Sequence, residues 1–162
     1  MLRRIALLLA LSTLLAAPAV AQVPLLDIRI GAHAAMPMGD LADIFTAGFG
    51  AYGRIGIPAG PVKLMASATW TRLRGKSVTL PVIGTVGLPD QDVISIQAGP
   101  HFSPAPLFDI GLEAGYFTNM DKFGLAPNVS LGLIKFDLTA SYNMVFTDPS
   151  SSWINLGVGL RF

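Results

Sequence analysis

Cysteine is absent from the 162-residue chain and charge is scarce. Without cysteine there is no disulfide scaffold, thiolate metal site or cysteine nucleophile. Charged residues make up 13% of the chain, against about 25% in typical soluble domains. The 52% apolar content excludes a disordered chain, and the net charge of +1 gives no reason to expect a nucleic-acid partner. These absences leave a single-domain membrane protein, or a soluble barrel with an unusually apolar surface.

The first 21 residues have the pattern of an export signal. Arg3 and Arg4 precede an apolar stretch at residues 5–17, Pro18 follows, and residues 19–21 read Ala-Val-Ala. The stretch is shorter than the roughly 20 residues of a membrane-spanning helix. We therefore expect a cleaved signal peptide over residues 1–21 and a β-barrel domain over residues 22–162. A short membrane anchor is the alternative.

Beyond residue 21, hydrophobicity alternates with a period of two. Between Phe136 and Phe146, apolar and polar side chains take turns almost without exception. Such alternation is typical of β-strands with one apolar face. The pattern predicts eight strands of about ten residues, the length at which a tilted strand crosses a membrane: residues 26–36, 48–57, 62–72, 92–102, 108–117, 125–133, 136–146 and 152–162. Because proline cannot donate to a sheet ladder, we place Pro100 and Pro127 near strand ends.

Connections between these strands alternate in length. Residues 58–61, 103–106 and 134–135 form short links, whereas residues 37–47, 73–91, 118–124 and 147–151 form longer loops. Outer-membrane barrels have short periplasmic turns and longer external loops. The expected fold is therefore all-β, an eight-stranded antiparallel up-and-down transmembrane β-barrel.

Aromatic residues indicate which face meets lipid. On the apolar faces they fall at the strand ends, as in the interfacial girdles of membrane barrels. Phe49, Trp70, Tyr116 and Phe146 form the outer girdle, and Phe102, Phe108, Phe136 and Phe162 the inner one.

The opposite faces carry few charges, of both signs, and we expect these to pair inside the barrel. The predicted luminal polar cluster consists of Asp27, Arg29, Arg54, Lys63, Asp109, Glu113 and Asp137.

The C-terminal strand carries a recognisable spacing of Asn155, Gly157, Leu160 and Phe162. This pattern resembles the assembly signal of bacterial outer-membrane barrels, which the barrel-assembly machinery reads during insertion. Residues 30–41 and 47–50 also resemble the first hairpin of the outer-membrane-protein β-barrel domain family, which includes small eight-stranded barrels similar to outer membrane protein X. The resemblance implies location in the bacterial outer membrane, and its generic motifs support the fold more than any activity.

Few residues suggest chemistry. Gly48, Gly50 and Gly53 match a dinucleotide-binding fingerprint by letters, but no helix follows them. His33 and His101 should lie far apart in the lumen, so we expect no metal site. The sequence indicates no catalytic residue and no cofactor.

Arg72, Arg74 and Lys76 cluster at the outer end of their strand. They are candidates for contact with lipopolysaccharide phosphates, because cationic side chains complement polyanionic head groups. A solvated loop is the alternative.

The expected function is a structural or surface-interaction role, with external loops available to an extracellular partner. Side chains should fill an eight-stranded lumen. Three alternatives stay open: a narrow channel with porin-like conductance, an outer-membrane lipid-modifying enzyme, and a soluble periplasmic lipid-binding barrel.

Overall fold

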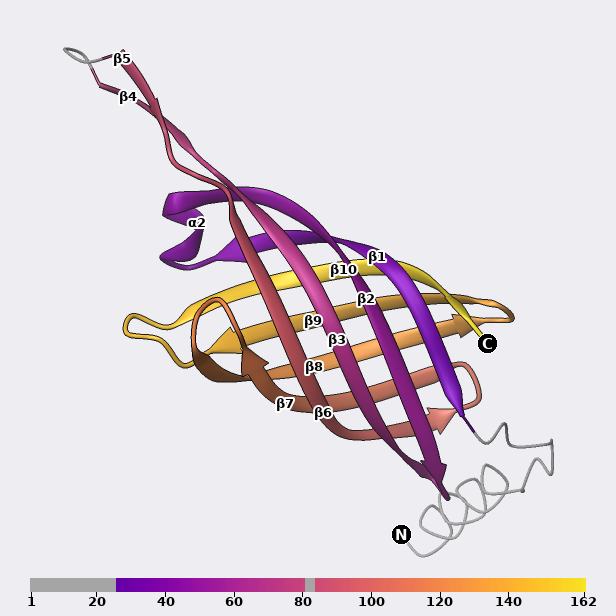
Figure 1. Ribbon diagram of the computed structural model, residues 1–162. Coiled ribbons are helices and arrows are strands. Elements are labelled where there is room, and N and C mark those ends of the chain that lie inside the picture. Colours follow the sequence, from indigo (N-terminus) through magenta and orange to yellow (C-terminus); the bar gives the residue numbers. More distant parts are fainter. Residues whose placement is uncertain (1–25, 81–83) are drawn as a thin grey trace, which may run out of the picture.

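The computed structural model describes residues 26–80 and 84–162. The predicted signal peptide lies outside the described residues. Eight strands close into an antiparallel barrel in which each strand pairs with its neighbours along the chain, and the last strand pairs with the first (Figure 1). The strands are β1 (Asp27–Met38), β2 (Phe45–Ala59), β3 (Val62–Gly75), β6 (Gln91–Ala105), β7 (Phe108–Phe117), β8 (Lys122–Leu133), β9 (Phe136–Val145) and β10 (Ser151–Arg161). All eight predicted strands are present, and the predicted fold class is confirmed.

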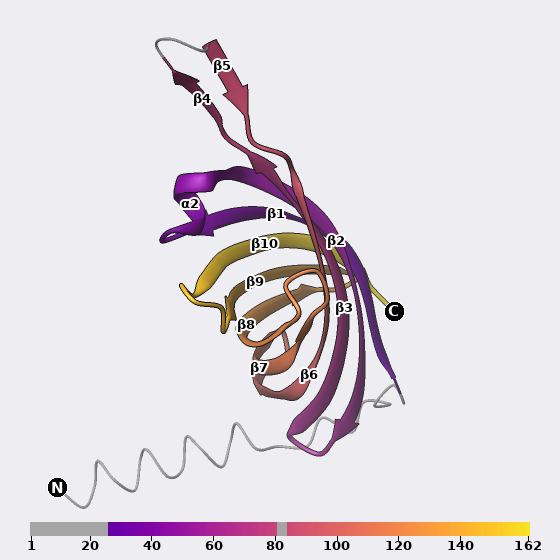
Figure 2. The ribbon, with the colours of Figure 1, turned by 60° about the vertical axis from the view of Figure 1, so that its left-hand side comes forward.

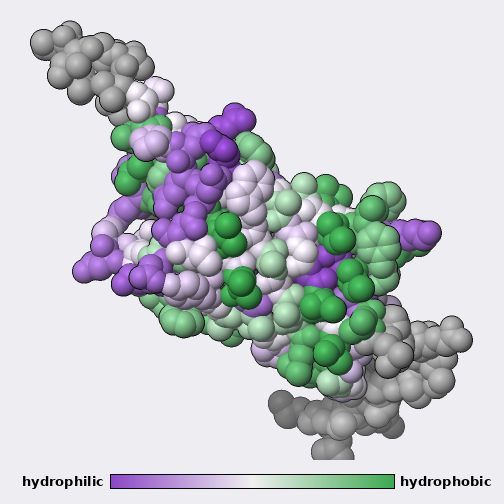
Figure 3. Space-filling model, viewed as in Figure 1, coloured by the Kyte–Doolittle hydropathy of each residue, from purple (hydrophilic) through white to green (hydrophobic). Residues whose placement is uncertain are grey.

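Side chains alternate between the lumen and the outer wall along each strand. In β6, Ile96 on the wall is 64% exposed, whereas Asp137 of β9 in the lumen is 0% exposed. Apolar residues cover the outside and polar residues the inside, which is the reverse of a soluble barrel. Figure 3 shows a largely apolar wall, with hydrophilic surface concentrated near the base of the β4–β5 ribbon. The chain is therefore a transmembrane β-barrel.

The two ends of the barrel differ. The short turns 60–61, 106–107 and 134–135 lie at one end, here called the turn end, together with the start of β1 and the end of β10. The longer connections lie at the other, here called the loop end. There the four-residue helix α2 (Leu41–Ile44) joins β1 to β2, so part of the 37–47 loop is helical and β2 begins at Phe45.

The predicted 73–91 loop is mostly strand. β3 continues to Gly75, and β4 (Ser77–Leu80) pairs with β5 (Gly84–Gly87) as a separate two-stranded ribbon. Figures 1 and 2 show this ribbon projecting well beyond the barrel. The loop expectation was wrong, although the sequence carries a strand signal here: residues 77–80 read Ser-Val-Thr-Leu and residues 85–88 read Thr-Val-Gly-Leu, and both runs alternate in polarity and contain β-branched residues.

The expectation that both prolines lie near strand ends was wrong. Pro100 pairs with Leu64 inside β6, and Pro127 pairs with Leu112 inside β8. The sheet accommodates each by interrupting one ladder: the β6–β7 pairing omits Gly99 and Pro100, and the β8–β9 pairing omits Ala126 and Pro127. The missing amide donor thus faces the neighbour with which no pair forms.

No helix among the described residues is long and apolar enough to cross a membrane.

Candidate functional site

An ionic network fills the turn end of the lumen. The guanidinium of Arg29 donates to Asp27, Asp109 and Asp137, at 2.8, 2.5 and 2.9 Å. The ammonium of Lys63 lies 2.9 Å from Asp27 and 3.0 Å from Asp109. Five of the seven predicted luminal residues therefore meet in one network.

Arg161, which is not among the predicted luminal residues, joins the same network through a 2.9 Å ion pair with Asp27. Ser103 donates to Asp109. Arg161 could have been found, because it stands on the polar face of the last strand. Three arginine or lysine side chains thus face three aspartates, so the network is formally neutral.

The two remaining predicted luminal residues lie apart from this network. Glu113 accepts from Ser67 at 2.5 Å and lies 2.8 Å from Nε2 of His101. Arg54 donates to Thr139 at 3.1 Å, with its guanidinium carbon 5.2 Å from the ring centre of Tyr52. Glu113 and Arg54 are both buried in the lumen, and these contacts hold its middle.

An apolar plug closes the loop end of the lumen. Its buried members come from α2 and from seven of the barrel strands: Ala35, Leu41, Phe45, Leu73, Val93, Phe117, Val145 and Trp153, with Met120 packed against them. The rings of Phe117 and Trp153 meet edge to face at 5.5 Å, a favoured aromatic geometry. The plug is not predicted from the sequence, because the alternation predicts polar or small residues at every inward position.

Glycines make room for rings inside the barrel. A Cβ on Gly31 or Gly159 would lie 2.6 Å from the phenol of Tyr52, and one on Gly157 would lie 3.0 Å from its ring. Tyr52 of β2 therefore spans β1 and touches β10, across the junction where the barrel closes. A Cβ on Gly50 would likewise collide with His33, and one on Gly111 with His101. These close approaches give the five glycines a packing role, which for Gly50 needs no nucleotide.

Catalytic geometry is not found in the described lumen. A serine hydrolase needs histidine between serine and an acid, but here Glu113 stands between Ser67 and His101. His33 bonds to Thr71 at 2.9 Å instead of to a carboxylate. No group of three or more metal-ligating side chains occurs among the described residues.

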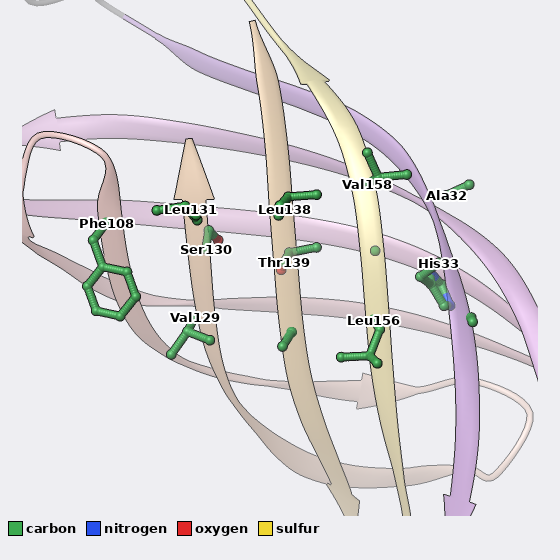
Figure 4. Close-up of a pocket in the computed structure, with 13 residues that line it drawn as sticks. Ala32, His33, Phe108, Val129, Ser130, Leu131, Leu138, Thr139, Leu156 and Val158 are labelled. Carbon is green, nitrogen blue, oxygen red and sulfur yellow. The ribbon is translucent and has the colours of Figure 1, made fainter. Parts of the chain in front are cut away.

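The outer wall has a broad depression of about 650 Å³ (Figure 4). Leu131, Leu138, Leu156 and Val158 line it from β8, β9 and β10. The polar residues at its floor, His33, Ser130 and Thr139, are buried on the luminal side. The depression therefore presents hydrocarbon to lipid and offers no reacting group.

The loop end of β2 and β3 combines aromatic and cationic side chains. Phe49 and Trp70 meet edge to face at 5.8 Å, and the guanidinium of Arg74 lies 5.5 Å from the Phe49 ring centre. Arg72 pairs with Asp90 at 3.2 Å, with both side chains about 40% exposed. The Gly75 amide, and then Arg72, lower the pKa of Asp90. Such an exposed pair is weak and screened by salt, so the Arg72 guanidinium can exchange partners.

The predicted girdle residues lie on the outer wall. Phe49, Phe102, Phe108, Phe136, Phe146 and Phe162 are exposed there, with Trp70, and Tyr116 is half-buried. Phe123, whose ring centre lies 5.3 Å from that of Tyr116, is not among the predicted girdle residues, because the predicted strand begins at residue 125 whereas β8 begins at Lys122. Of the four assembly-signal residues, Asn155 and Gly157 face inward, whereas Leu160 and Phe162, the latter directly after β10, face outward.

Comparisons with known proteins bear on the fold alone. No family model matches the chain, and no curated protein matches it in sequence. Among solved structures, a de novo designed transmembrane β-barrel aligns with a TM-score of 0.53 at 11% identity, over 87% of this chain and 98% of its own. Ail, the attachment invasion locus protein of Yersinia pestis, aligns in complex with the heparin analogue sucrose octasulfate, with a TM-score of 0.51 at 20% identity, over 85% and 97%.

Ail in a phospholipid bilayer nanodisc aligns with a TM-score of 0.53 at 20% identity, over 84% of this chain and 99% of that one. The predicted resemblance to small eight-stranded outer-membrane barrels is therefore confirmed at the level of fold.

Proposed function

We propose that the protein is a surface protein of the bacterial outer membrane, exported through a cleaved signal peptide, whose barrel serves as an anchor. The observation that carries this is the double closure of the lumen, by the ionic network at one end and the apolar plug at the other. A filled lumen leaves the outer wall, the loop end and the β4–β5 ribbon as the surfaces available for function.

The loop end is suited to polyanions. Arg72, Arg74 and Lys76 follow one another along β3 and its continuation, and they lie above the aromatic pair of Phe49 and Trp70. We assign these three cations to lipopolysaccharide phosphates. The complex of Ail with a sulfated sugar supports anion binding as a use for this fold. The 37–47 connection and the ribbon are the surfaces for an extracellular partner.

Insertion would use the last strand. Leu160 and Phe162 stand exposed on the outer wall at the turn end, where the barrel-assembly machinery could reach them together with Asn155 and Gly157. Gly157 also serves packing, since a Cβ there would meet Tyr52 and Thr139.

The alternatives fit the structure less well. A narrow channel would need a path through Arg29, Lys63 and their three aspartates and then through the plug. A lipid-modifying enzyme would need a reacting group on the wall, and the polar floor of the depression in Figure 4 faces the lumen instead. A soluble lipid carrier would need an outer surface that water can solvate.

Fractionation tests the proposal most directly. We expect the protein in the detergent-soluble outer-membrane fraction, with heat-modifiable gel mobility and no steady conductance in a planar bilayer. Recovery from the soluble periplasm would overturn the proposal, and steady conductance would establish the channel. A change in the lipid A mass spectrum on expression would establish the enzyme. For the lipopolysaccharide contact, replacing Arg72, Arg74 and Lys76 with glutamine should weaken association, and unchanged association would refute it.

A further inference from the structure

A second groove crosses the outer wall on the opposite side from the depression of Figure 4. Two hollows of about 400 and 390 Å³ share Gly53 and Ala68 in their floors. Strand pairing sets them in one row as Ile30, Gly53, Ala68 and Ile96 across β1, β2, β3 and β6. Two small residues thus lie between two isoleucines. The groove continues toward the loop end past Ala51 to Trp70.

Gly53 has no packing role inside the protein. A Cβ added to Gly31, Gly50 or Gly157 would collide with neighbouring atoms, whereas a Cβ added to Gly53 would meet no atom within 4 Å. The backbone φ of Gly53 is not positive. A glycine inside a strand destabilises it relative to alanine, and such glycines often mark the close approach of a ligand. The open space lies on the wall, where the neighbours are lipids.

The groove has a polar head at its loop end. The row beyond Trp70 contains Phe49 and Arg72, and Arg74 follows over the Phe49 ring. Arg74 takes part in none of the ion pairs among the described residues. Rows two residues apart differ in depth by about 5 Å for tilted strands, so the three steps from Arg72 to Ile55 span about 15 Å. That is about half the hydrocarbon thickness of a bilayer, or one leaflet.

We propose that this groove, with Gly53 and Ala68 as its floor, seats an acyl chain of lipopolysaccharide while Arg72 and Arg74 hold the phosphate of the same molecule. The inference rests on the proposed lipopolysaccharide contact and extends it to the membrane interior. The order of hydrocarbon groove, aromatic pair and cations matches the order of acyl chain, sugar and phosphate in the ligand. Charge complementarity selects an anionic lipid, and the position at the loop end selects the outer leaflet.

A substitution that fills the groove distinguishes binding of the acyl chain from binding of the phosphate. Gly53→Leu places a side chain in the open space, and Ala114→Leu, on the exposed wall of β7, adds bulk elsewhere as a control. Lipid A and its fully deacylated bisphosphorylated disaccharide would be titrated into the detergent-solubilised barrel and followed by native mass spectrometry. Gly53→Leu should weaken lipid A binding about tenfold, the loss expected when two methylene groups lose their contacts. It should leave disaccharide binding unchanged.

The double variant Arg72→Gln with Arg74→Gln should weaken the binding of both lipid A and the deacylated disaccharide. Equal lipid A binding by Gly53→Leu, Ala114→Leu and the unmodified protein would overturn the acyl-chain site while leaving the phosphate contact intact. Unchanged binding by the arginine variant would instead overturn the phosphate contact. Equal affinity for phosphatidylglycerol would show that the groove takes any anionic lipid, against the proposal. If Gly53→Leu lacks heat-modifiable mobility, Ala68→Leu fills the same floor from β3.

Discussion

The two ends of the lumen are closed by opposite kinds of chemistry. At the turn end, Arg29 and Lys63 sit among three carboxylates. At the loop end, Leu73, Phe117 and Trp153 pack without charge. The two closures support each other, because the ion pairs at the turn end become stronger when water is excluded from the lumen. An apolar plug at the end that carries the long connections keeps water away from the polar lumen. The plug and the network are therefore complementary parts of one seal.

Loss of Arg29 should have the largest effect. Arg29→Gln leaves Asp27, Asp109 and Asp137 buried without their shared partner, and breaking a buried ion pair from one side costs about 3–5 kcal/mol. The free energy of unfolding, measured by urea titration in lipid vesicles, should fall by that amount. The matched control is Arg72→Gln, which removes an exposed cation and should change stability by less than about 1 kcal/mol. Equal losses for the two variants would show that the network does not stabilise the barrel.

The plug should respond to loss of volume. Leu73 is 0% exposed, and Leu73→Ala leaves a cavity that costs about 2–5 kcal/mol in a packed core. The same urea titration measures it. Ala51→Gly, a smaller deletion on the exposed wall, is the control and should cost less. If Leu73→Ala costs no more than the control, the loop end is not a packed core.

The sequence was sufficient for the wall and insufficient for the plug. Alternation from Phe136 to Phe146 fixes which side chains face outward, because the period of two leaves each strand a single choice. The alternation does not show where along a strand the inward residues change from polar to apolar. Phe117 and Trp153 occupy inward positions of their strands, unlike the outward-facing aromatic residues of the girdles. Only this inward position identifies them as core residues. Likewise, the partners of Glu113 lie 12 to 46 residues away along the chain, on other strands, and no local pattern specifies such pairing.

A charged substitution on the outer wall tests whether the apolar outer surface faces lipid. Leu112 is 48% exposed on β7, and Leu112→Arg would place in lipid the same group that Arg29 places in the lumen. We expect a loss of about 2–4 kcal/mol if the position lies near the bilayer midplane. Leu88→Arg, in the connection before β6, should change stability by less than about 0.5 kcal/mol. Tolerance of Leu112→Arg in vesicles would mean that this wall does not face hydrocarbon.

The smallest expected effect is a gain at the turn end. Ile134 occupies a two-residue hairpin turn with φ of 57° and is 94% exposed. A β-branched residue is strained in this left-handed region, where asparagine is well tolerated. Ile134→Asn should therefore raise the free energy of unfolding by about 1 kcal/mol. Because the turn lies at the far end from the plug, its gain should add to the loss in Leu73→Ala to within about 0.5 kcal/mol. A larger deviation in the double variant would show that the two ends are energetically coupled, which would make the seal a cooperative unit.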